Sequence, residues 1–230
     1  MLLLKSEGDF NRIWAGVVSK NNNLSIVVQA GGESRRMGRS KACVPFLGRP
    51  LIWRSIERLL PLADEFIITT NEPEKLDFLS ELTGSGKISL VTDTYEERGA
   101  LRGIYSAISA ASKEYVSLIA CDMVFPSPNL IMAELEALME TGADVAVPKT
   151  QFGYEPFHGV YKKDTCLPVI YKEIEQGTCR AAGWFDKIKV EIFNMDMVLA
   201  AEPEGRCFIN VNTPQELYKV EQKIIHGIYS

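Results

Sequence analysis

Short apolar runs alternate with longer amphipathic stretches from Leu24 onwards. The first runs are continuous and rich in β-branched residues, a pattern typical of strands that are buried on both faces of a parallel sheet. The predicted strands cover residues 25–28, 65–69, 87–91, 115–120 and 144–147, and amphipathic helices are predicted between them over 50–60, 103–111 and 129–141. This alternation predicts a three-layer α/β fold, with a mostly parallel, Rossmann-like sheet and helices on both faces.

The rhythm changes after Pro148. Shorter strands are predicted over 157–161, 190–193 and 207–211, with helices over 167–176 and 214–225. We expect this half to extend the sheet. Residues 1–23 are predicted to be an N-terminal extension with one short helix over 9–18, so the expected organisation is an extension, 1–23, and a single domain, 24–230.

Composition narrows the class of protein. A net charge of −5 argues against a general nucleic-acid binder, which normally carries a basic face. Apolar runs are too short for a membrane span or a signal peptide. The five cysteines form no C-x-x-C pair and, with only two histidines, make a zinc site improbable. We therefore expect reduced thiols and a cytoplasmic protein without a nucleic-acid or membrane partner.

A glycine-rich turn, residues 30–41, follows the first predicted strand directly. Ligands of parallel α/β sheets bind beyond the carboxyl ends of the strands, and glycines there let backbone N–H groups approach a phosphate. Arg35, Arg36, Arg39 and Lys41 add positive charge suited to a triphosphate. The spacing fits neither the P-loop nor the G-x-G-x-x-G fingerprint.

This turn resembles the signature of molybdenum cofactor guanylyltransferases, written roughly A-G-G-x-S-x-R-M-G-x-x-K. Every fixed position is present: Ala30, Gly31, Gly32, Ser34, Arg36, Met37, Gly38 and Lys41. The resemblance continues through 45–51 and covers roughly residues 24–225, which disfavours the alternative of a surface turn with solvated arginines. It implies a nucleotidyltransferase fold and transfer of GMP from GTP to the phosphate of molybdopterin, with release of pyrophosphate and formation of molybdopterin guanine dinucleotide.

Asp122 is the candidate metal ligand. It follows the strand predicted over 115–120, so its carboxylate faces the same crevice as the glycine turn. Mg²⁺ prefers one or two carboxylates together with phosphate oxygens. The family holds Mg²⁺ with the aspartate at this position, and the resemblance gives that role to Asp122, although Val124 replaces the usual proline. The alternative, an Asp122 that caps the next helix, is disfavoured because that helix is predicted to begin nearer Ser127.

Polar residues beyond two further strands are candidates for nucleoside recognition. Asp93 follows the strand at 87–91, and Thr69 and Asn71 follow the strand at 65–69. The resemblance gives GTP contacts to Asp93 and Thr69, with Asn71 nearby; Asp93 would read either the guanine N1–H/N2–H edge or the ribose. Residues 99–104 resemble Gly-Pro-Leu-Ala-Gly-Ile, with Ala100 and Arg102 as departures. The resulting GTP-binding set is Gln29, Ala30, Gly31, Gly32, Ser34, Arg36, Gly38, Lys41, Thr69, Asn71, Asp93, Gly103 and Asp122.

The second half carries weaker site candidates. Residues 155–161 resemble Glu-Pro-Leu-His-Ala-Val-Tyr, in which His158 is either a general base or, more readily, a structural histidine near the acceptor pocket. Residues 208–217 resemble Phe-x-Asn-Ile-Asn-Thr-Pro-Glu-Glu-Leu. Thr213 is predicted to cap the last helix, and Asn210 and Asn212 are assigned to the metal or acceptor side.

The implied chemistry needs no general base, because a phosphate monoester is already anionic near neutral pH. Lys41, Arg36 and Mg²⁺ on Asp122 would then act by positioning and charge neutralisation. The implied partners are GTP, molybdopterin or its molybdenum form, and, transiently, other molybdenum-cofactor proteins. Two alternatives stay open: a cytidylyl- or sugar-phosphate nucleotidyltransferase of the same fold, and a non-catalytic nucleotide-binding regulator.

Overall fold

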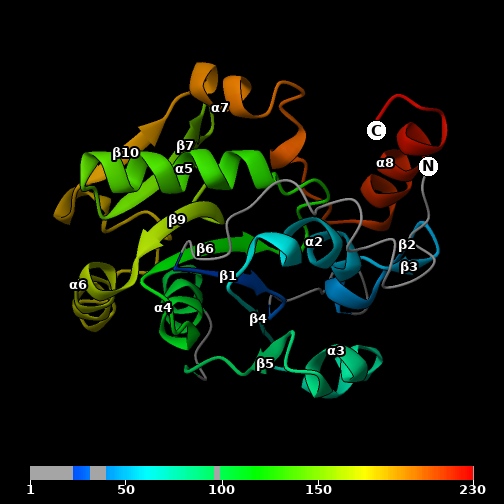
Figure 1. Ribbon diagram of the computed structural model, residues 1–230, viewed down its shortest axis with the longest axis horizontal. Helices are drawn as coiled ribbons and strands as arrows, with labels where there is room; N and C mark the ends of the chain where they lie inside the picture. The colour runs from blue at the N-terminus through cyan, green and yellow to red at the C-terminus, as the bar shows by residue number, and fades with distance from the viewer. Residues whose placement is uncertain (1–22, 32–39, 96–98, 230) are drawn as a thin grey trace.

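The computed structural model describes residues 23–31, 40–95 and 99–229, and its centre is one eight-stranded sheet with helices on both faces (Figure 1). The strands follow one another across the sheet in the order β10-β7-β9-β6-β1-β4-β5, and β8 pairs with β7. Their bounds are β1 (Leu24–Gln29), β4 (Glu65–Thr69), β5 (Ser89–Val91), β6 (Tyr115–Ala120), β7 (Val145–Thr150), β8 (Gly153–Tyr154), β9 (His158–Lys162) and β10 (Val190–Phe193). The predicted α/β class is confirmed.

Most neighbouring strands of this sheet are parallel. β1 lies between β6 and β4, β4 pairs with β5, and β7 pairs with β10, all in parallel. β9 is antiparallel to both β6 and β7. A parallel return from β7 would need a crossover of about a dozen residues or more, and the stretch from β7 to β9 is shorter than that. The carboxyl ends of β1, β4, β5, β6 and β7 therefore meet at one edge.

Helices cover the two faces of the sheet (Figure 1). Apolar residues of α2 (Ile52–Leu59), α5 (Pro128–Thr141) and α7 (Met195–Ala201) pack on one face. Those of α4 (Ala100–Ala110) and α6 (Lys163–Glu175) pack on the other. A smaller apolar cluster joins α8 (Pro214–Ile225) to the hairpin of β2 (Pro45–Phe46) and β3 (Arg49–Pro50). The helices predicted over 50–60, 103–111, 129–141, 167–176 and 214–225 are all confirmed.

Two helix starts explain how the loops beside the sheet edge are held. Ser127 caps α5, because its Oγ accepts a hydrogen bond from the Leu130 amide, and Pro128 occupies the first helical position. Thr213 caps α8 through a capping box with Glu216. Both caps fix the residues that precede them, which lie at the carboxyl edge of the sheet.

The strand predicted over 207–211 is wrong. Residues Arg206–Phe208 form a short 3₁₀ helix, and Asn210 makes only an isolated bridge with Met123. The apolar run lies between a left-handed Gly205 (φ 59°) and the Thr213 cap of α8, and it begins with the 3₁₀ turn instead of an extended segment. The pattern also missed α3 (Ser80–Gly84) and α7, and the helix predicted over 9–18 lies outside the described residues.

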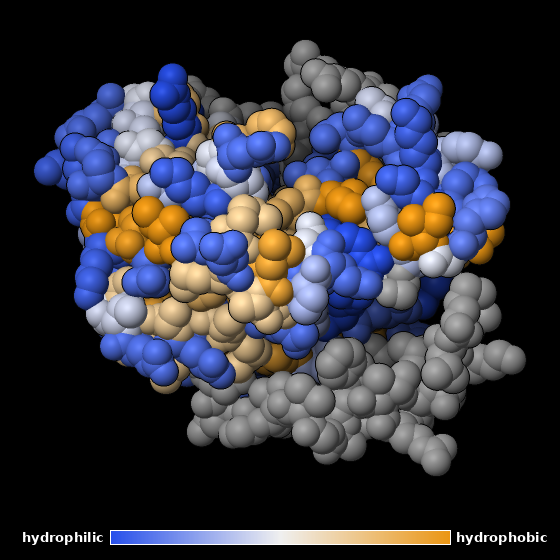
Figure 2. All heavy atoms as spheres, turned by 90° about the horizontal axis from the view of Figure 1, so that it is seen from above, coloured by the Kyte–Doolittle hydropathy of each residue, from blue (hydrophilic) through white to orange (hydrophobic). Residues whose placement is uncertain are grey.

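The face seen in Figure 2 is largely polar, with separate apolar groups between. Large apolar side chains exposed on the described surface include Met139, Ile192 and Leu199. Within the described part of the chain, no helix is both long and apolar enough to cross a membrane.

Candidate functional site

The ends of β1, β4 and β6 are tied together at the sheet edge. The Cys121 amide donates to the Gln29 carbonyl at 3.0 Å, and the Ala30 amide donates to the Thr69 carbonyl at 2.8 Å. These bonds continue the parallel pairing one residue past the strands, so the start of the glycine turn and Asp122 leave the sheet side by side. The prediction that both lie at one edge is confirmed.

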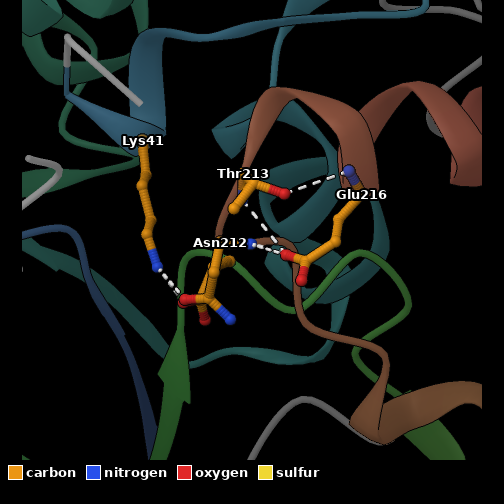
Figure 3. A network of polar contacts seen from close by, with 5 residues as sticks. Lys41, Asn212, Thr213 and Glu216 are labelled. Atoms are coloured by element: carbon orange, nitrogen blue, oxygen red, sulfur yellow. Dashed lines mark hydrogen bonds and ion pairs between the residues drawn. The ribbon is translucent and has the colours of Figure 1, made fainter. Parts of the chain in front are cut away.

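Lys41, Asp122 and Asn212 meet at this edge. Figure 3 shows the Lys41 side chain directed toward Asn212. The Lys41 Nζ lies 2.6 Å from Asp122 Oδ2 and 2.6 Å from Asn212 Oδ1. The Lys41 and Asp122 side chains are 16% and 18% exposed, so the pair is half-buried while still open to a ligand. Two oxygens from separate segments thus converge on one cationic group.

Asn212 is held by the first turn of α8. Its amide donates to Glu216 Oε2 at 2.7 Å, and the Thr213 amide donates to the same oxygen at 3.1 Å. The bond from the Asn212 amide is the main reason that the pKa of Glu216 is lowered, with further lowering from Thr213 and from the charge of Lys41. A Thr-x-x-Glu capping spacing was visible in the sequence, but its use in positioning Asn212 was not anticipated.

Two backbone bonds join the Asp122 segment to the Asn212 segment. The Val211 amide donates to the Asp122 carbonyl at 3.1 Å, and the Val124 amide donates to the Ile209 carbonyl at 3.2 Å. Val124, which stands where the family has proline, is fully buried against α8. Its amide makes a bond that proline lacks, so this departure from the family adds a contact between the two segments.

Asp122 is not a helix cap, because Ser127 fills that role for α5. Its neighbour Cys121 is buried, which raises the pKa of that thiol to about 12. Cys121 is therefore a neutral thiol at neutral pH, unsuited to nucleophilic catalysis. Among the described residues, no group of three or more His, Cys, Asp or Glu side chains is arranged to hold a metal. A metal at this edge would depend on Asp122 together with amide and ligand oxygens.

A second polar group lies beyond β4 and β5. Asn71 Nδ2 donates to Asp93 Oδ2 at 2.9 Å, and the Asp93 amide donates to Asn71 Oδ1 at 3.3 Å. Gly31 lies against this pair, because a Cβ built on it would come 2.9 Å from Asp93 Oδ2. The glycine is needed here for close approach of the turn to the carboxylate.

The Gln29 side chain packs against α4 where Gly103 has no side chain. A Cβ on Gly103 would lie 2.4 Å from Gln29 Nε2, so only glycine accommodates the carboxamide in this position. Gln29 is half-buried and at the carboxyl end of β1. Arg102, the departure from the family's alanine, places its guanidinium 5.8 Å from the Tyr95 ring centre. Ala100, which replaces proline, is the exposed first residue of the helix.

Two predicted site residues are not presented to a ligand. Thr69 is fully buried, and its Oγ1 has no hydrogen-bond partner in the described part of the chain. Thr69 is the last residue of β4, in which residues 66–69 are all buried, whereas Asn71 lies beyond the end of the strand and is exposed. His158 is fully buried against Glu134. Asn210 is exposed beside Met123. Gly32, Ser34, Arg36 and Gly38 lie outside the described residues.

Comparisons with known proteins show the family of this chain. The family model described as the MobA-like NTP transferase domain matches residues 26–185. The chain is 33% identical over 202 residues to the molybdenum cofactor guanylyltransferase of Desulfosudis oleivorans, covering 87% of this chain and 96% of the relative. It is 31% identical to a probable molybdenum cofactor guanylyltransferase of Natranaerobius thermophilus, covering 85% and 94%.

A solved structure has a similar fold. The molybdopterin-guanine dinucleotide biosynthesis protein A from Archaeoglobus fulgidus superimposes with a TM-score of 0.74 at 21% identity, covering 88% of this chain and 99% of that one. Its elements correspond along nearly the whole described domain, which supports the fold.

Proposed function

This chain belongs to the MobA-like NTP transferase family, and we propose that it transfers GMP from GTP to the phosphate of molybdopterin. The product is molybdopterin guanine dinucleotide, and pyrophosphate is released. The family assignment makes the chain a nucleotidyltransferase. We also propose which residues perform the transfer and which metal ion they use.

The observation that carries the proposal is the convergence of Asp122 Oδ2 and Asn212 Oδ1 on the Lys41 ammonium, at 2.6 Å each. Hard oxygen atoms around a cationic group are the donor set that suits Mg²⁺, which takes one or two protein ligands and completes its shell with phosphate oxygens and water. The donor set therefore fits Mg²⁺, with Asp122 as the charged ligand and Asn212 as a neutral neighbour. When bound, Mg²⁺ supplies charge neutralisation at the triphosphate.

In the proposed reaction an oxygen of the acceptor phosphate attacks the α-phosphorus of GTP. The bond from that phosphorus to the bridging oxygen of the β-phosphate breaks, and pyrophosphate leaves with the bonding electrons. Lys41 is released from Asp122 toward the phosphates and neutralises charge that develops there. No side chain has to remove a proton, because the acceptor oxygen is already anionic, and the neutral thiol of Cys121 takes no part.

We assign the nucleoside to the neighbouring edge between β1, β5 and α4. Asp93 offers a carboxylate that pairs with two adjacent N–H donors of guanine or with ribose hydroxyls, and Asn71 orients it. The Gln29 carboxamide, packed against Gly103, adds a donor and an acceptor on the same side of the sheet. In this proposal the turn residues over 32–39, Arg36 among them, complete the phosphate side. The transferase unit is residues 24–230.

The acceptor is assigned to the side of the Asp122 and Asn212 segments, opposite the nucleoside. Asn210 and Asn212 stand there as exposed amides that suit a phosphorylated pterin.

The direct test is release of pyrophosphate from GTP by the purified full-length chain. We expect release to require both molybdopterin and Mg²⁺ and to stop when EDTA removes the metal. GTP binding without any transfer, under conditions in which a known guanylyltransferase is active, would instead support the regulator alternative.

A further inference from the structure

A buried acid–imidazole pair lies beneath the proposed metal site. Glu134 on α5 and His158 at the start of β9 are both fully buried, with His158 Nδ1 3.5 Å from Glu134 Oε1. The surrounding side chains are mostly apolar, and burial raises the pKa of Glu134 to about 7. Polar groups removed from water destabilise a core unless other contacts compensate. The pair therefore requires a reason beyond packing.

The contacts of the imidazole define its tautomer. The backbone N–H of Ser127 donates to His158 Nε2 at 3.3 Å, so that nitrogen accepts and the ring proton resides on Nδ1, facing Glu134. Ser127 is the residue at which the loop carrying Asp122 ends and α5 begins. The hydroxyl of Ser127 is also engaged, because it accepts from the Leu130 amide and donates to Glu202 at 2.7 Å. His158 thus holds the far end of the Asp122 loop.

The same ring contacts the segment that carries Asn212. The Phe208 ring packs edge-on against His158, with 6.0 Å between the ring centres. Phe208 ends the 3₁₀ helix four residues before Asn212. The backbone of β9 is joined to β6 as well, since His158 pairs with Ile119 and the Ala120 amide donates to the Phe157 carbonyl. One side chain therefore lies under both segments whose oxygens converge on Lys41.

We propose that His158 is a positioning residue for the transfer reaction: its imidazole, oriented by Glu134, sets the position of the Asp122 and Asn212 segments relative to the sheet without touching either substrate. This inference rests on the proposed function. The two segments are joined to each other by backbone bonds at Asp122 and Val124. These bonds hold the segments together but do not set the position of the joined pair relative to β9. A displacement of about 1 Å in such a site slows a reaction by about 10²-fold.

Two variants separate this role from simple packing. His158→Gln has an oxygen that reaches the position of Nε2 and accepts from Ser127, whereas His158→Leu fills the space without an acceptor. We expect the leucine variant to lose about 10- to 100-fold in kcat with little change in the KM for GTP, and the glutamine variant to stay within about threefold. The Mg²⁺ concentration for half-maximal rate should rise in the leucine variant alone.

Glu134 offers a matched pair of changes. Glu134→Gln keeps an oxygen for the Nδ1–H of His158, so its rate should stay near that of the unaltered chain. Glu134→Leu removes the acceptor beside Nδ1, so the ring is no longer oriented from that side; its rate should fall in the same direction as in His158→Leu. All rates are expressed per folded molecule, with folding checked by circular dichroism and thermal unfolding.

The inference is overturned if folded His158→Leu matches the unaltered chain in kcat and in Mg²⁺ dependence, or if folded His158→Gln is damaged as much as the leucine variant. Failure of the proposed function has a different signature, because the unaltered chain itself would then transfer no GMP. In that event calorimetry measures the affinity of the same four variants for GTP with and without Mg²⁺. We expect the gain in affinity that Mg²⁺ gives to be smaller only in the two leucine variants.

Discussion

The two sides of the site are built in different ways. On the phosphate side, Lys41, Asp122 and Asn212 come from three separate segments and are tied by an ion pair, backbone bonds and a helix cap. On the proposed nucleoside side, the Asn71–Asp93 pair lies close against Gly31, and the Gln29 carboxamide lies close against Gly103. The first side is held together by charged groups, and the second by side chains packed closely against glycines. If the proposed roles hold, changes on the first side should alter the reaction rate and changes on the second should alter the selection among bases.

The largest effect is expected from Asp122→Asn. The change keeps the shape of the side chain and removes the charge proposed to hold Mg²⁺, so turnover should fall about 10²-fold or more while the preference among bases is kept. Steady-state rates over a range of Mg²⁺ concentrations measure this, with the exposed Asp186→Asn as control. Near-normal turnover at saturating Mg²⁺ would remove Asp122 from the metal site.

Lys41→Ala should have the next largest effect. Loss of one cation at the triphosphate is expected to weaken GTP binding or slow transfer by about 10- to 100-fold. The fold should stay intact, because the Lys41 ammonium is bound by side-chain oxygens of Asp122 and Asn212 at the edge of the sheet and is not part of the apolar core. The exposed Lys172→Ala is the control. A variant that unfolds, but whose remaining native fraction is fully active, would show that Lys41 is structural.

Asp93→Ala probes the nucleoside side. If Asp93 accepts from guanine, its removal lowers the preference for GTP over ATP and CTP by about 1–3 kcal/mol and leaves the phosphate contacts unchanged. Dissociation constants for the three nucleotides, measured on this variant and on the exposed-site control Asp77→Ala, decide the matter. Equal weakening of all three would move Asp93 from the base to the ribose.

Gly103→Ala should have the smallest effect on the reaction rate, and it should slightly increase the stability of the fold. Alanine in the helix interior stabilises α4 by about 0.5–1 kcal/mol, while its Cβ displaces the Gln29 carboxamide. We expect a slightly higher midpoint of thermal unfolding together with a few-fold change in the preference among GTP, ATP and CTP. An unchanged preference in the stabilised variant would show that Gln29 does not face the base.

The sequence was most informative where local signals and the sheet pattern agree. Continuous β-branched runs located β4, β6 and β10 at their observed bounds, and Thr213-Pro214 located the start of α8. The strand expected over 207–211 was wrong because an apolar run does not reveal whether a partner strand is within reach. The residues at 206–208 form a 3₁₀ turn, and residue 210 makes one isolated bridge with Met123.

Side-chain direction is what the sequence did not reveal about the site. Thr69 and Asn71 differ by two positions, yet the end of β4 between them leaves one buried and the other exposed. The fit of Gln29 into Gly103 joins residues far apart in the chain, and no local pattern signals it. His158 was recognised as structural, but its contacts to Ser127 and Phe208 depend on tertiary packing.

The central claim, a nucleotidyltransferase whose nucleoside side selects guanine, is tested most directly by competition between donors. The unaltered chain is given molybdopterin, Mg²⁺ and equal concentrations of GTP and CTP, and the dinucleotide products are separated and counted. We predict that molybdopterin guanine dinucleotide predominates at least about tenfold, as expected when one base leaves a buried acceptor unpaired. Predominance of the cytosine product would contradict the guanylyltransferase assignment and identify the chain as a cytidylyltransferase.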